Sequence, residues 1–137
     1  MAVDKGYIGY NGARHLATGR APQHIQNLVI RDYCGRHGLP FKLSASEYAM
    51  PHCYMMLDKL VEEIGQHDGI VMYSMFMLPA RTARRRALYR RILGAGASLH
   101  AAVEDLALAT ETDLARWEDI LRVQALVAAT APPVFEE

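Results

Sequence analysis

The stretch "GIVMYS" (69–74) decides the fold, because its first four residues are apolar or glycine without a charged interruption. A strand of this composition is typical of the centre of a parallel sheet, where helices cover both faces. The chain then passes through "MFMLP" (75–79) into a segment with six arginines between residues 81 and 91. We therefore predict a buried central strand that ends beside a basic helix.

Strands and helices alternate on either side of this segment. The patterns predict strands over 6–11, 41–46, 69–74 and 98–104, with an amphipathic helix after each, the first opening at Pro22, the second at Pro51 and the third at Pro79. Strict alternation over 41–46 indicates an edge strand with one wet face. The predicted fold is a single three-layer α/β domain over 1–130, with a four-stranded parallel sheet in the order 2-1-3-4 and a loose tail over 131–137.

Composition limits the classes of partner. The 137 residues carry no formal net charge, so no overall attraction to nucleic acid or to a membrane surface is expected. The two cysteines, Cys34 and Cys53, have no metal-ligand spacing and are expected to be reduced thiols. No signal peptide and no membrane-length apolar run is recognisable, and we expect a cytoplasmic protein that assembles as a homo-oligomer.

In open parallel sheets, ligands bind beyond the carboxyl ends of the strands, where the strand order reverses. The predicted order places that point between the strands over 6–11 and 69–74. Glu47 and Glu104 follow two strands and form a candidate acid/base pair, with Ser74 beside them as a third candidate catalytic residue. The candidate substrate-binding residues are Asn11, Arg20, His24, Gln26, Tyr48, Tyr73, Phe76, Arg81 and His100.

Several of these residues allow a second interpretation. His100 is either a general base or a hydrogen-bonded core residue, and a glutamate after a strand is often a helix cap. Arg20 or Arg81 is a candidate phosphate ligand, although no glycine-rich phosphate motif is present. "MFMLP" (75–79) is either a wall of the site or part of a subunit contact, and most of the arginine run is expected to be solvated. We predict neither a metal nor a cofactor.

Two segments, "YIGYNGARHLATGRAPQHIQNLVIRDYCGRHGL" (7–39) and "LDKLVEEIGQHDGIVMYSMFMLP" (57–79), resemble the catalytic domain of resolvase-type serine recombinases. The resemblance implies a resolvase-like fold. Those enzymes need a nucleophilic serine in the first loop, whereas this chain has Gly12 and Arg14 at the key places. The arginines that follow the third strand in that family are also missing from "MFMLP" (75–79). Strand-transfer chemistry is therefore not expected.

Four shorter blocks resemble the sporadic carbohydrate cluster proteins, a family of small bacterial proteins. These blocks are "APQHIQNLVIRDYC" (21–34), "LSASEYAMPHCYMML" (43–57), "GIVMYSMFMLP" (69–79) and "LHAAVEDL" (99–106). The family name reflects an association with surface-polysaccharide biosynthesis, and no defined activity comes with it.

Together these features lead to one main hypothesis and two alternatives. The main hypothesis is an enzyme that modifies a carbohydrate or sugar nucleotide, by isomerisation, epimerisation or hydrolysis, with Glu47 and Glu104 transferring protons. The first alternative is a non-catalytic binding or interaction module on a resolvase-like scaffold, with "MFMLP" and the final helix as contact surfaces. The second is nucleic-acid binding through the arginine-rich helix, which the zero net charge disfavours.

Overall fold

A computed structural model describes residues 5–12, 21–50 and 52–130 as one α/β domain with a five-stranded mixed sheet. The strands are β1 (Tyr7–Asn11), β2 (Phe41–Ser46), β3 (Gly69–Met72), β4 (Ser98–Ala101) and β5 (Leu106–Leu108). Their order across the sheet is β2-β1-β3-β4-β5. The first four strands are parallel and follow the predicted order, and β5 pairs antiparallel with β4.

The prediction of four strands was therefore incomplete. The segment 98–104 was read as one strand, but β4 stops at Ala101 and a turn brings the chain back as β5. Within this turn Asp105 adopts a positive φ of 54°, a conformation that aspartate tolerates better than most residues. Nothing in the alternation of 98–108 marks the reversal, because the turn contains neither glycine nor proline.

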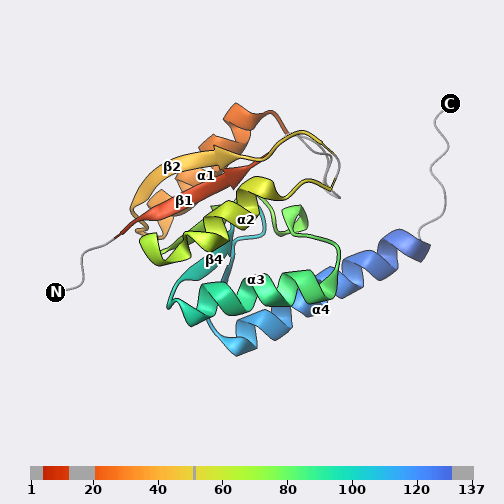
Figure 1. Ribbon diagram of the computed structural model, residues 1–137. Coiled ribbons are helices and arrows are strands. Elements are labelled where there is room, and N and C mark those ends of the chain that lie inside the picture. Colours follow the sequence, from red (N-terminus) through yellow and green to blue (C-terminus); the bar gives the residue numbers. More distant parts are fainter. Residues whose placement is uncertain (1–4, 13–20, 51, 131–137) are drawn as a thin grey trace, which may run out of the picture.

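The helices form two layers on opposite faces of the sheet (Figure 1). Helix α1 (Gln23–Arg36) covers one face, and α2 (Met55–Glu62), α3 (Thr82–Gly94) and α4 (Glu111–Thr130) belong to the other. Two short 3-10 helices, η1 (Ile64–Gln66) and η2 (Met75–Met77), flank β3. None of the helices in the described part of the chain is long and apolar enough to cross a membrane.

Alternate residues of the central strand feed two separate cores, as a strand covered on both faces requires. Ile70 and Met72 point into the larger core beneath α2, α3 and α4, where Trp117 is fully buried. Val71 points to the other face and packs with Ile30 and Tyr33 of α1. The buried central strand predicted from "GIVMYS" is thus confirmed.

Strand β2 is the predicted edge strand, but its alternation breaks. Tyr7 pairs with Phe41 and Gly9 pairs with Ser44, so β2 carries one extra residue in this interval. A bulge of this kind reverses the facing of the residues beyond it. The extra residue explains why Leu43, an inward residue in the simple pattern, is 56% exposed.

Two helix starts and one surface assignment need correction. Helix α2 begins at Met55 rather than at Pro51, and α3 begins at Thr82 rather than at Pro79. Between β3 and α3 the chain forms η2, which buries Met75 and Met77, and Leu78 follows them into the larger core. "MFMLP" is therefore mainly core, and it does not form the exposed contact surface that was predicted for an interaction module.

One residue of the arginine run is buried and joins α3 to α4. The guanidinium of Arg85 donates two hydrogen bonds of 2.9 Å to the carboxylate of Glu118, and Tyr89 donates a third of 2.8 Å. Arg85 also donates to the carbonyl oxygens of Pro79 and Ala80, at 3.0 and 2.7 Å. Burial alone would raise the pKa of Glu118, but these donors hold it below its ordinary value. The carboxylate is therefore ionised and paired within the chain.

This geometry predicts that Arg85→Met destabilises the protein strongly, by about 3 to 5 kcal/mol, because Glu118 would be left charged and buried without its cation. Arg84→Met is the matched control, since the Arg84–Asp58 pair is largely exposed and should contribute less than about 1 kcal/mol. Urea unfolding of both variants measures the difference. Equal losses in the two variants would contradict the assigned role of Arg85.

Candidate functional site

The carboxyl ends of the parallel strands carry most of the predicted site residues. The structure places four of them at this edge of the sheet. Asn11 is the last residue of β1, and Glu47, Ser74 and Glu104 lie in the segments that follow β2, β3 and β4. Asn11, Glu47 and Ser74 are buried, whereas Tyr48 and Arg81 are exposed. What these groups can do chemically depends on which of their donors and acceptors are already occupied.

Glu47 lies at a junction of three elements. Its carboxylate accepts hydrogen bonds from the Tyr10 hydroxyl of β1 at 2.8 Å and from the Tyr48 amide at 3.1 Å. It also accepts the amides of Met56 and Leu57, at 3.0 and 3.2 Å. The last two amides belong to the first turn of α2, so the side chain satisfies donors that have no partner inside the helix.

The pKa of Glu47 reflects these contacts. Burial on its own would raise the pKa, but the hydrogen bonds from Met56, Tyr10, Leu57 and Tyr48 together outweigh it and keep the pKa below its ordinary value. Glu47 is therefore an ionised carboxylate at neutral pH. Its oxygen atoms face donors that belong to the fold, which is the geometry of a helix cap.

Glu104 performs a similar task at the end of β3. Its two oxygen atoms accept the Ser74 hydroxyl at 2.9 Å and the Met75 amide at 2.7 Å. Ser74 in turn accepts the Phe76 amide at 3.2 Å, so its hydroxyl donates to Glu104 and accepts from η2. Tyr73 and Phe76 are half-buried against the larger core. Glu47 and Glu104 thus accept hydrogen bonds from different partners, and each fixes the start of a different helical segment.

The amide side chains after β1 are also occupied by the fold. Gln26 donates to the carbonyl oxygens of Gly12 and Ala21, at 2.6 and 2.8 Å, and accepts the Gly12 amide at 3.1 Å. Asn11 donates to Asn27 at 2.6 Å and accepts the Ser46 hydroxyl at 2.7 Å. Gln26 therefore joins Gly12 to Ala21. The candidate phosphate ligand Arg20 lies outside the described residues. His24 is exposed on α1.

His100 lies away from this edge, inside β4 on the face covered by α1. Its Nδ1 atom is 2.8 Å from the Tyr33 hydroxyl, and its Nε2 atom is 2.8 Å from Ser98 Oγ. Burial, with a smaller contribution from the charge of His37, lowers the pKa of His100 from 6.5 to about 4. His100 is therefore neutral at physiological pH, and its two hydrogen bonds connect Tyr33 to Ser98.

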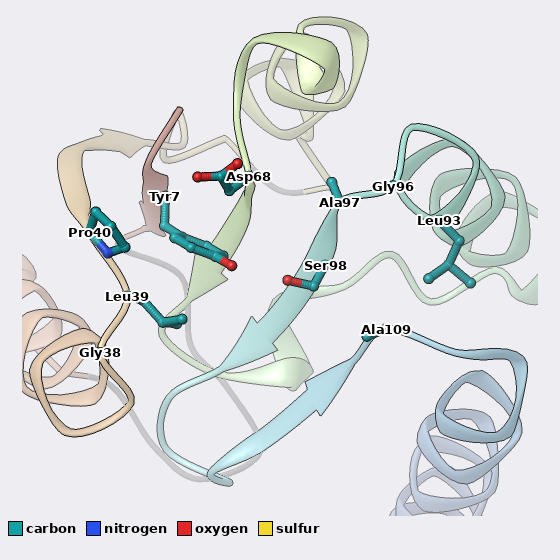
Figure 2. Close-up of a pocket in the computed structure, with 10 residues that line it drawn as sticks. All are labelled: Tyr7, Gly38, Leu39, Pro40, Asp68, Leu93, Gly96, Ala97, Ser98 and Ala109. Carbon is teal, nitrogen blue, oxygen red and sulfur yellow. The ribbon is translucent and has the colours of Figure 1, made fainter. Parts of the chain in front are cut away.

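The amino ends of the strands border a cavity of about 500 Å³. Its lining includes Tyr7, Asp68 and Ser98 from the starts of β1, β3 and β4, and Figure 2 shows the Tyr7 and Ser98 hydroxyls pointing toward each other. The sequence predicted a ligand site only at the carboxyl ends of the strands, and this cavity at the amino ends was not predicted. The one available signal was Ser98-x-His100, since residues two apart on a strand share a face.

Within residues 5–12, 21–50 and 52–130, no group of three or more His, Cys, Asp or Glu side chains is placed to hold a metal ion. Cys34 and Cys53 are both buried free thiols in the described structure. The Cys53 thiol lies 3.8 Å from Glu47, where it adds to the donors around that carboxylate.

The low pKa of His100 predicts a defined loss of stability in mild acid. Between pH 6.5 and about 4, His100 is protonated in the unfolded chain but stays neutral in the folded chain. The free energy of unfolding should therefore fall as the pH drops through this range. His100 should account for roughly 3 kcal/mol of the fall. His67, whose pKa burial also lowers, acts in the same direction.

Urea unfolding of the wild type and of His100→Gln at several pH values measures this contribution. The variant should lose less stability than the wild type between pH 6.5 and 4, because only the wild type gains a proton at position 100 when it unfolds. Parallel curves for the two proteins would show that His100 is not held neutral.

No family model matches the chain, and no curated protein matches it. A search of solved structures finds the N-terminal catalytic domain of TP901-1 integrase, with a TM-score of 0.56 and 10% sequence identity over 92% of this chain and 99% of that one. At such low identity the likeness concerns the fold alone. The resemblance to sporadic carbohydrate cluster proteins finds no support in these comparisons, whereas the structure of this chain is similar to a serine integrase catalytic domain, as its resolvase-like pattern predicted.

Proposed function

We propose that this chain is a non-catalytic binding module built on a resolvase-like scaffold. One observation carries the proposal: the candidate catalytic side chains Glu47, Ser74 and Glu104 are hydrogen-bonded to backbone amides at the starts of α2 and η2. A general acid or base must reach a proton of the substrate, and a side chain whose acceptors face the fold is poorly placed for that.

The expected enzyme acting on carbohydrates or sugar nucleotides is the less favoured alternative. It requires two carboxyl groups whose environments push their pKa values apart, so that one is an acid and the other a base. The pKa of Glu47 is lowered, which suits a permanent acceptor of hydrogen bonds rather than a proton donor at neutral pH. Glu104 likewise accepts hydrogen bonds on both oxygen atoms, from Ser74 and from the Met75 amide, so its oxygen atoms also face the fold.

Recombinase activity is not proposed either. The solved neighbour is described as a catalytic domain, and the corresponding chemistry in serine recombinases needs a serine in the loop after the first strand. Residues 12–20 of this chain read "GARHLATGR" and contain no serine. A resolvase-like scaffold without its nucleophile supports a role in recognition.

The proposal predicts that Glu47→Gln destabilises the protein by about 2 kcal/mol, because the new amide group would place a donor against backbone amides that now donate to the carboxylate. Glu62→Gln, on the exposed side of α2, is the matched control and should stay within about 0.5 kcal/mol of the wild type. Urea unfolding at neutral pH provides the comparison.

A catalytic glutamate behaves differently, because replacing a residue held in a site for function often leaves stability unchanged or raises it. If the wild type turns over a sugar nucleotide, and Glu47→Gln unfolds like the wild type but loses that turnover, the enzyme hypothesis replaces this proposal.

A further inference from the structure

The cavity at the amino ends of the strands has a preorganised polar wall. Ser98 Oγ is held by His100, and His100 is held in turn by the buried hydroxyl of Tyr33, with both distances at 2.8 Å. The Asp68 carboxylate is fixed as well, because one of its oxygen atoms accepts the Gly6 amide at 2.8 Å. Groups fixed by the protein lose little conformational freedom when a ligand binds.

Gly69 allows the aromatic part of this wall to form. A Cβ atom at this position would lie 2.3 Å from the Ser98 carbonyl oxygen and 2.8 Å from Cε2 of Tyr7. The absence of a side chain therefore lets the Tyr7 ring lie across the start of β3 toward β4. There it packs in a T-shaped arrangement with the His100 ring, with a centroid separation of 5.5 Å. Figure 2 shows this ring between Asp68 and Ser98.

The charge of the wall indicates what kind of ligand it would take. Among the described residues that line the cavity, only Asp68 carries a formal charge. A carboxylate beside the face of a tyrosine ring suits an ammonium group, which gains from both the ion pair and the ring quadrupole. The remaining wall combines the apolar side chains of Leu39, Leu93 and Ala109 with a larger share of polar surface, so the body of a small ligand would contact both. A volume of about 500 Å³ is in the range of small-molecule sites.

A serine hydrogen-bonded to a histidine is also found in enzymes of acyl transfer, but the backbone around Ser98 does not suit that chemistry. A serine nucleophile needs backbone donors for the oxyanion. The amide of Ser98 donates to the Asp68 carbonyl oxygen at 3.1 Å, and the amide of Ala97 donates to Ile92 at 3.1 Å. The amides of Ala97 and Ser98 thus already have acceptors within the fold. The hydrogen bonds from Tyr33 through His100 hold the Ser98 hydroxyl in one orientation.

We propose that this cavity binds a small primary amine, its ammonium group between Asp68 and the Tyr7 ring and Ser98 accepting a further hydrogen bond. The inference rests on the proposed function, since it names the ligand class for a binding module. It places recognition at the edge of the sheet opposite Glu47 and Glu104.

The test is a titration of the ¹⁵N-labelled full chain followed by NMR, with cyclohexylamine and 2-phenylethylamine as probes and the neutral alcohols cyclohexanol and 2-phenylethanol as shape-matched controls. The amines, added up to about 10 mM, should shift the amide signals of Gly38, Asp68 and Ser98 with at least about tenfold higher affinity than the alcohols. No shift with any amine, equal affinity for the alcohols, or shifts confined to other regions would each overturn the proposal.

Two variants locate the ammonium group. Asp68→Asn keeps an oxygen atom for the Gly6 amide but removes the charge, and it should weaken amine binding by about tenfold. Asp58→Asn, which removes an exposed carboxylate on α2, should bind as the wild type does. Undiminished binding by Asp68→Asn would contradict the proposal.

The outcome is separate from the test of the proposed function, which depends on the stability of Glu47→Gln. A destabilised Glu47→Gln with no amine binding would leave a binding module whose ligand is of another class.

Discussion

The carboxylate of Glu47 is the contact on which the carboxyl edge of the sheet depends. It connects Tyr10 of β1, the turn after β2 and the first turn of α2 through hydrogen bonds of 2.8 to 3.2 Å. Glu104 repeats the arrangement in the turn after β4, where it fixes η2. Because helix starts carry amides without partners, buried carboxylates are an effective way to join a strand end to the helix that follows.

The hydrogen bonds of Glu47 and Glu104 change the expected location of a ligand site. In parallel sheets the carboxyl edge is the usual location, and the resolvase-like scaffold makes that edge the first candidate. Here the acceptors at that edge are used to hold the fold together. The amino edge instead offers a cavity with a hydroxyl, a phenol and a carboxylate in its wall, each kept in place by contacts behind it.

Much of the fold could be predicted from the sequence because its signals are periodic. The apolar run of β3 and the stripes of the helices report burial directly, and they led to the correct order of four strands. The reversal into β5 could not be found, since it depends on the positive φ of Asp105 and not on a turn residue such as glycine or proline. The start of α2 was misplaced for a related reason: Glu47, which accepts its first amides, precedes the helix by several residues. The start of α3 was misplaced because the chain first forms η2, which is held by Glu104, a residue distant in sequence.

The candidate site was harder to predict, because residue type does not reveal which hydrogen bonds are already made. Glu47 and Glu104 were correctly located at strand ends, and their roles as caps emerge only from their partners. The pKa of Glu47, measured by NMR titration of its ¹³C-labelled carboxyl group, tests this central claim most directly. We expect a pKa below the ordinary value for glutamate, with the carboxylate ionised throughout the neutral range. A pKa raised toward neutrality would contradict it, and would return Glu47 to the role of a general acid.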